Sequence, residues 1–254
     1  MFFSFLVPSR RKDNPNSNLI RFLDSLEVNT KDRSNLEVVI KFDVDDDIKE
    51  VIGKFPQYSF DIKYFLSDSG NGYLDLYHFL NQCFFKVNKK SNIVIPIADD
   101  FTVNLSNWDD VVRQSVFSND LSSGIFVIHR FPPPLDEPLS FIWDSRCHVD
   151  EVPMFSRRLM NIIGSFTNSS DVEIFLLEMM LYHLHQDKIF HHLPNELFFR
   201  HCCDRDNTGH QRWYTERKVL EDRTKNPLLL EIYAQRANTI HDELKKELKS
   251  DQNY

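Results

Sequence analysis

The sequence predicts an α/β fold in which a mostly parallel sheet is flanked by helices. Short apolar segments with the composition of buried strands lie at residues 2–7, 36–42, 60–66 and 92–97. Stretches with apolar residues at helical spacing separate several of these segments. Each apolar segment also ends in a polar or acidic loop. This alternation is typical of parallel sheets, in which ligands bind beside the carboxyl ends of the strands.

The first two strands are predicted from continuous apolar runs. Residues 2–7 (FFSFLV) lack the polar alternation of a half-exposed strand, which indicates burial on both faces, and a Pro-Ser-Arg-Arg turn follows. Leucine and phenylalanine then recur at helical spacing over residues 19–26, and the asparagines before them can cap a helix. Residues 36–42 (LEVVIKF) form the second expected strand, which runs into an acidic segment.

The next elements repeat the pattern. Residues 60–66 (FDIKYFL) predict a third strand that closes in a Gly-containing polar turn, and residues 74–84 have helical spacing. A fourth strand at residues 92–97 (NIVIPI) leads directly into Ala98, Asp99 and Asp100. The acidic pair therefore lies at the expected carboxyl end of a buried strand.

The second half of the chain has a less regular pattern. We expect strands at residues 124–129 and 139–143, helices at residues 155–163 and 171–186, an extended segment at 193–203 and a final helix at 228–249 with a charged end. We interpret residues 1–254 as one domain, with a first half at about 1–101 and a second at about 102–254. A hydrophobic fraction of 41%, with 22 phenylalanines, is enough for a substantial core.

Charge and cysteine content limit the function classes. The net charge of −8 argues against a protein whose main task is binding nucleic acid, although a local cleft with a metal can still attract a small anion. The four cysteines form no CxxC pair, so reduced thiols in the cytoplasm are expected. No apolar run approaches the ~18 residues needed to cross a bilayer, so a membrane role would have to be peripheral.

Asp99 and Asp100 are the most direct candidates for chemistry. A hard divalent cation such as Mn²⁺ or Mg²⁺ prefers carboxylate and phosphate oxygens, and it neutralises the charge of a leaving diphosphate. Adjacent aspartates after a strand also occur in ordinary turns and helix caps. Spacing alone does not separate these two interpretations.

Three short motifs resemble the GT-A glycosyltransferases, and family 2 in particular. FLVPSRR resembles that family's first strand and turn, KFDVDD its second strand ending in an aspartate, and IPIADDF its strand with a DXD-type motif. The resemblance spans residues 2–101, with weaker similarity to about residue 210. It implies a GT-A (Rossmann-like) fold whose C-terminal helical extension lies on the acceptor side. It also implies a hexosyltransferase-type enzyme that passes a sugar from a nucleoside-diphosphate sugar to a carbohydrate or other hydroxyl acceptor in an inverting reaction. A non-processive enzyme is expected, because Gln211 and Arg212 are adjacent, unlike in the QxxRW motif of processive synthases, and no transmembrane segment is seen for extruding a polymer.

The resemblance also implies roles for residues of the first half. Asp43 lies near the base, and Asp100 binds the metal. The remaining nucleotide-sugar contacts come from residues in the turns after the strands, namely Pro8, Ser9, Arg10, Arg11, Asp68, Asn71 and Asp99. Ala98 departs from the acidic first position of the DXD-type triplet, which weakens the expected dependence on metal.

In the second half the resemblance implies a catalytic base and one more metal ligand. Asp171, at the start of a helix, is the expected base that removes the acceptor proton, with Glu173 in reserve. An ordinary N-cap explains Asp171 equally well. His201 is expected to complete the metal site or approach the diphosphate. Cys202 and Cys203 beside it also suggest zinc, but further ligands at suitable spacing are lacking.

Two other functions remain open at this point. A nucleotidyltransferase would also place acidic residues after strands, but it normally has a Gly-rich loop after the first strand, and residues 8–18 contain no glycine. A GT-A-like protein that binds a nucleotide or sugar without catalysis is compatible with Ala98.

Overall fold

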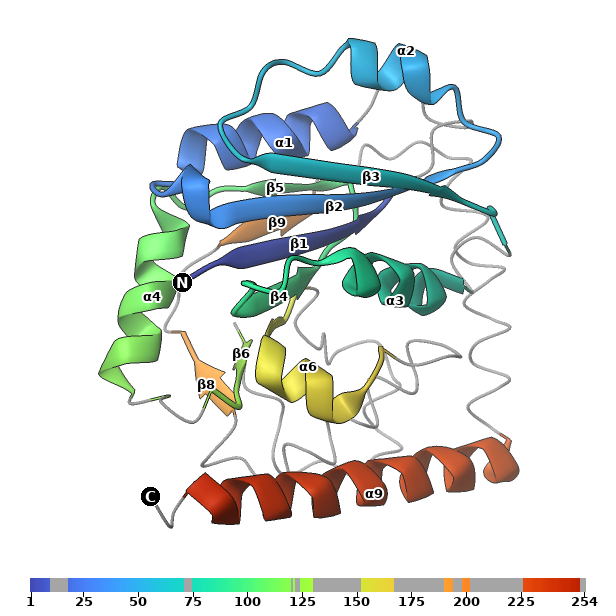
Figure 1. Cartoon of the computed structure of the whole chain (residues 1–254), viewed down its shortest axis with the longest axis vertical. Helices are drawn as coiled ribbons and strands as arrows, with labels where there is room; N and C mark the ends of the chain where they lie inside the picture. The colour runs from blue at the N-terminus through green and yellow to red at the C-terminus, as the bar shows by residue number, and fades with distance from the viewer. Residues whose placement is uncertain are drawn as a thin grey trace.

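The computed structural model describes residues 1–9, 18–70, 75–119, 121, 124–129, 152–166, 190–193, 198–201 and 226–251. Over these residues the main sheet has seven strands in the order β3-β2-β1-β4-β7-β6-β8 (Figure 1). The strands are β1 (Phe3–Pro8), β2 (Leu36–Asp43), β3 (Asp61–Ser67), β4 (Ile93–Pro96), β6 (Val127–His129), β7 (Met154–Ser156) and β8 (Phe190–His192). A separate pair is formed by β5 (Phe101–Val103) and β9 (Phe199–His201).

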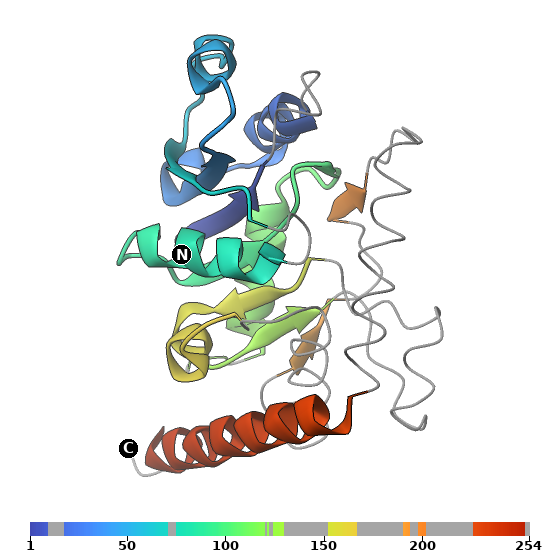
Figure 2. The same ribbon diagram turned by 90° about the vertical axis from the view of Figure 1, so that its right-hand side faces the viewer.

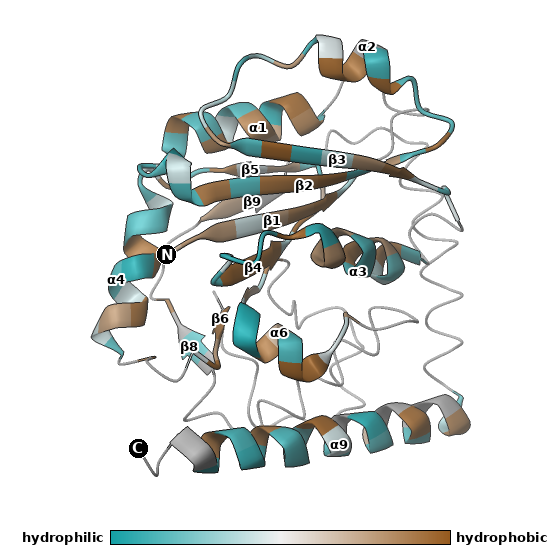
Figure 3. Cartoon of the chain, viewed as in Figure 1, coloured by the Kyte–Doolittle hydropathy of each residue, from teal (hydrophilic) through white to brown (hydrophobic). Residues whose placement is uncertain are grey.

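The first four strands confirm the predicted parallel sheet. β1 lies between β2 and β4 and is parallel to both, and β3 is parallel to β2. Their carboxyl ends therefore meet at one edge, where the arrowheads of β1, β2 and β3 lie in Figure 1. β1, β2 and β4 are almost fully buried, as expected for strands covered on both faces, and Figure 3 shows their largely apolar colouring.

Helices cover both faces of this sheet. One face packs against α1 (Asn18–Asn29) and α4 (Trp108–Ser118), and the other against α3 (Leu76–Lys86) and α6 (Arg157–Ile163). Alternate residues of β1 serve the two faces, since Phe5 packs with Phe22 and Trp108 while Leu6 belongs to the cluster that contains Leu80. Figure 2 shows α3 and α6 on the same side of the sheet. A 3-10 turn (Arg33–Asn35) and α2 (Ile48–Gly53) complete this half.

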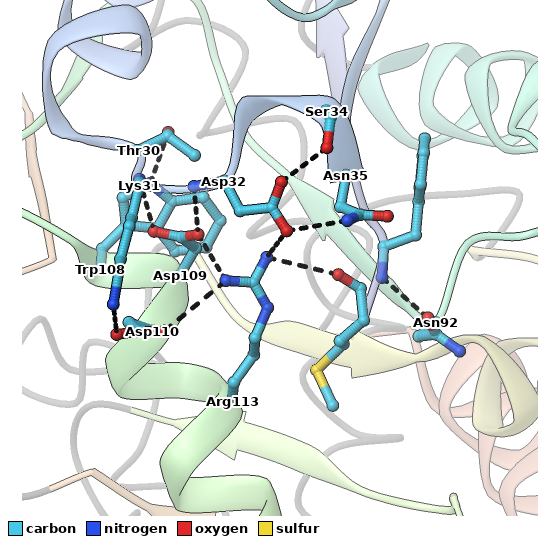
Figure 4. A network of polar contacts seen from close by, with 12 residues as sticks. Thr30, Lys31, Asp32, Ser34, Asn35, Asn92, Trp108, Asp109, Asp110 and Arg113 are labelled. Atoms are coloured by element: carbon cyan, nitrogen blue, oxygen red, sulfur yellow. Dashed lines mark hydrogen bonds and ion pairs between the residues drawn. The ribbon is translucent and has the colours of Figure 1, made fainter.

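A buried aspartate fastens α4 to the segment between α1 and β2 (Figure 4). Asp109 is fully buried and accepts hydrogen bonds from the backbone N–H groups of Lys31 (2.9 Å) and Asp32 (3.0 Å). Arg113 Nη1 donates to the same carboxylate at 2.6 Å, and Trp108 Nε1 donates to Thr30 at 3.0 Å. These contacts lie at the amino-terminal end of β2, so they hold the scaffold at the edge opposite the strand ends.

The second half adds antiparallel neighbours to the sheet. β7 is antiparallel to both β4 and β6, and β6 is parallel to β8. The expected helix at residues 155–163 begins later, at Arg157, because Phe155 pairs with β4 and Ser156 caps the helix by accepting from Leu159 N at 3.2 Å. The final helix α9 (Pro227–Asp251) agrees with the prediction, and an Arg158–Glu247 ion pair of 2.9 Å joins it to α6.

Parts of the predicted extended segment at 193–203 appear as β9, whereas the expected strand at 139–143 and helix at 171–186 lie outside the described residues. Among the helices that the structure describes, none is long and apolar enough to cross a membrane.

Candidate functional site

The ends of β1, β2 and β4 are joined by direct contacts at one edge of the sheet. Ser9, just after β1, donates its backbone N–H to the carbonyl of Lys41 in β2 at 2.9 Å. The Ser9 hydroxyl donates to Asp99 Oδ2, after β4, at 2.6 Å. Val44 N donates to the carbonyl of Ser67 at 3.0 Å, which adds the end of β3. The turn and the acidic motif singled out in the sequence are therefore in contact, although ~90 residues separate them along the chain.

The hydrogen bond between Ser9 and Asp99 fixes one carboxylate of the acidic pair. Ser9 is only 3% exposed, so water competes little for its hydroxyl. Hydrogen bonds to ionised acceptors are short and about twice as strong as neutral ones. Ser9 was predicted to lie beside the nucleotide. The structure adds that its hydroxyl orients Asp99.

A buried ion pair lies at the end of β2. Lys41 Nζ contacts Asp43 Oδ1, both side chains are almost fully enclosed, and the ammonium lies 3.7 Å from the centroid of the Phe79 ring. The backbone N–H of Asp43 donates to Asp46 Oδ2 at 3.1 Å, which closes the following turn. Sequence reasoning missed Lys41. The available signal was a lysine in a largely apolar run, two positions before an aspartate.

The loop after β3 approaches the same cluster. Gly70 has a positive φ of 51°, and a Cβ atom there would lie 2.4 Å from Asp75 Oδ2 and 3.2 Å from Phe79 Cζ. The backbone conformation thus favours glycine, and a Cβ there would also have to displace the end of the Asp75 side chain. Asp68 belongs to this loop, which brings it to the same edge as Asp43.

The backbone also brings His201 beside the acidic pair. β5 and β9 pair antiparallel, with His201 opposite Phe101, the residue directly after Asp100. Carboxylate oxygens and an imidazole suit Mn²⁺, and Mg²⁺ is usually held by one or two carboxylates with phosphate oxygens and water. Within the part of the chain that is described, no three His, Cys, Asp or Glu side chains already form a metal-binding group.

Of the remaining predicted site residues, the structure describes Pro8 but not the other five. Pro8 is the last residue of β1 and the register partner of Lys41. Five predicted site residues lie outside the described residues: Arg10, Arg11, Asn71, Asp171 and Glu173.

Comparisons with known proteins give a structural likeness only. No protein-family model matches the sequence, and no curated protein matches it significantly. Residues 1–349 of S. aureus TarS in complex with UDP superpose with a TM-score of 0.57 at 15% identity, covering 78% of this chain and 60% of that one. A mannosyltransferase from Pyrobaculum calidifontis, in complex with GDP-Man and Mn²⁺, gives a TM-score of 0.55 at 15% identity, covering 97% of this chain and 75% of that one. At such identity the likeness shows a shared fold.

Proposed function

We propose that this chain, which has the GT-A fold, is a metal-assisted glycosyltransferase that moves a sugar from a nucleoside-diphosphate sugar to an acceptor hydroxyl. The observation that carries the proposal is the hydrogen bond from Ser9 to Asp99, which joins the turn after β1 to the acidic pair after β4. That contact brings two strand ends of a parallel sheet together, where such sheets bind ligands, and a diphosphate would lie beside them. The neighbours that contain UDP, or GDP-Man with Mn²⁺, agree with this class of donor.

The proposed nucleotide contacts follow the strand ends. Asp43 would receive the base and Asp99 the ribose or sugar. The other contacts come from Pro8, Ser9, Arg10, Arg11, Asp68 and Asn71. The two arginines would offset the diphosphate charge in a protein whose net charge is −8.

Asp100 and His201 are the proposed ligands of Mn²⁺ or Mg²⁺. When bound, the cation would stabilise the charge that develops on the leaving diphosphate. Asp100 would supply a charged oxygen from the carboxyl end of β4. His201 would approach from β9, where its backbone pairs with Phe101, the residue after Asp100. Ala98 removes one acidic side chain from the triplet, so phosphate oxygens would supply more of the coordination.

The proposed acceptor step uses a carboxylate as general base. Asp171, with Glu173 in reserve, would remove the proton from the acceptor hydroxyl as it attacks the anomeric carbon, giving an inverting and non-processive reaction. The support for these two residues is the sequence resemblance.

Calorimetry with UDP and GDP, with and without Mn²⁺, tests the proposal. Binding should require the metal and should weaken strongly in Asp100→Ala, because the variant loses the charged ligand between protein and phosphate. Asp110→Ala is the matched control, since Asp110 lies on α4 at the opposite edge and pairs with Lys31. Binding of equal strength without metal in the wild type and in Asp100→Ala would refute the proposed site. Hydrolysis of a panel of nucleotide sugars then identifies the donor.

A further inference from the structure

Lys41 carries a fully enclosed ammonium group. The residue is 1% exposed, and it lies on the face of the sheet covered by α3, close to Cys83 of that helix. Its partners are the Asp43 carboxylate and the face of Phe79. Removing a charge from water costs several kcal/mol, and replacing a buried ion pair with apolar residues is often neutral or stabilising. Packing alone therefore does not explain a lysine at this position.

The same strand provides a comparison at its other end. Glu37, at the start of β2, is also fully buried, but it accepts from Ser4 Oγ (2.6 Å), Asn88 N (2.7 Å) and Lys63 Nζ (2.6 Å). The Lys63 side chain is 41% exposed and keeps part of its hydration. The Lys41 side chain is 2% exposed, and the pair that it forms with Asp43 stands at the edge that carries the proposed nucleotide site.

An ionised carboxylate accepts hydrogen bonds and donates none. Uracil has a ring N–H at N3 and guanine has one at N1, and a carboxylate can accept a hydrogen bond from either. Cytosine presents a lone pair at N3, which a carboxylate repels. A fixed, charged Asp43 would therefore favour bases that carry a ring N–H.

We propose that Lys41 is a positioning residue that holds Asp43 in place as a charged acceptor, so that the site selects uracil or guanine diphosphates against cytosine diphosphates. The inference rests on the proposed function, because it assumes that Asp43 meets the base. Lys41 acts on the nucleotide only through Asp43. Its backbone also supports the site, since its carbonyl accepts the N–H of Ser9.

The test compares UDP, GDP and CDP by calorimetry in the presence of Mn²⁺. Lys41→Met keeps the unbranched stem against Phe79 and removes the charge. The dissociation constants of UDP and GDP should rise at least tenfold, while that of CDP should change less than threefold. Lys63→Met is the matched control, because it removes a lysine from the other ion pair of β2, and it should leave the ratio between the nucleotides unchanged.

A loss of the same factor for all three nucleotides in Lys41→Met would show a merely structural role and overturn the inference. Wild-type protein that binds CDP as tightly as UDP would overturn it as well, with the proposed function intact. Wild-type protein that binds none of the three would overturn the proposed function, and the inference with it.

A second variant keeps the proposal testable if Lys41→Met fails to fold. Asp43→Asn has the same size and retains an oxygen for Lys41, and its amide can donate to N3 of cytosine. The preference for UDP over CDP should fall at least tenfold. An unchanged preference in Asp43→Asn overturns the proposal.

Discussion

Replacing Ser9 with alanine removes the hydrogen bond that joins the turn after β1 to Asp99. The bond is 2.6 Å long, its donor is 3% exposed and its acceptor is a carboxylate, so its loss should cost about 1.5–3 kcal/mol. For a chain of this size ~1 kcal/mol lowers the melting temperature by about 2–4 °C, so we expect a decrease of roughly 3–12 °C. Because Asp99 also loses its fixed orientation, the KM for the donor should rise about tenfold, equivalent to ~1.4 kcal/mol.

Ser4 offers a matched control on the same strand. Its hydroxyl donates to Glu37 Oε1 at the same distance of 2.6 Å and is fully buried, but it lies at the amino-terminal end of β1. Ser4→Ala should lower the melting temperature similarly and leave the donor KM unchanged. Ser9→Thr retains a hydroxyl and should restore donor binding. If Ser9→Ala and Ser4→Ala had the same effect on the donor KM, the positioning role of Ser9 would be refuted.

Three further predictions test the proposed catalytic base, the glycine turn and the buried thiol. Asp171→Asn should keep donor affinity and melting temperature but lose turnover by about 10²-fold, whereas a simple N-cap would keep turnover. Gly70→Ala should destabilise the protein by about 1–3 kcal/mol in urea denaturation, since a residue with a Cβ is strained at a φ of 51°; an unchanged midpoint would contradict the described turn. Burial raises the pKa of the Cys83 thiol to about 12, so iodoacetamide at pH 8 should not modify Cys83 in the folded protein but should modify it in the urea-unfolded chain. Peptide mapping measures both reactions, and rapid labelling of Cys83 in the folded protein would contradict its burial.

The sequence located the strands of the first half to within about one residue. Residues 36–42, for example, were expected as a strand, and β2 runs from Leu36 to Asp43. This succeeded because strands buried on both faces need continuous apolar runs, which are visible without any knowledge of their neighbours. The same reasoning placed Phe155 in a helix, and the structure shows it in β7, paired with Val94. Its apolar spacing fits either element, so pairing with β4 decided the outcome.

In the candidate site, too, some residues were visible in the sequence and one was not. Asp99 and Asp100 were singled out because they directly follow a predicted strand, and Ser9 and Asp43 because their motifs resemble those of GT-A glycosyltransferases. The structure puts these residues at one edge, because parallel strands bring their carboxyl ends together, and their roles stay predictions. The role of Lys41 was not visible, because burial of its ammonium depends on Phe79, which comes from a distant helix.

By itself the sequence determined the parallel βα half and the edge at which its polar turns gather, since local apolar periodicity and turn residues encode both. Only the tertiary structure decided that β7 enters the sheet beside β4, that β9 lies beside Phe101, and that the Ser9 hydroxyl reaches Asp99. These contacts join segments far apart along the chain, and they form only where packing against the common core brings the segments together.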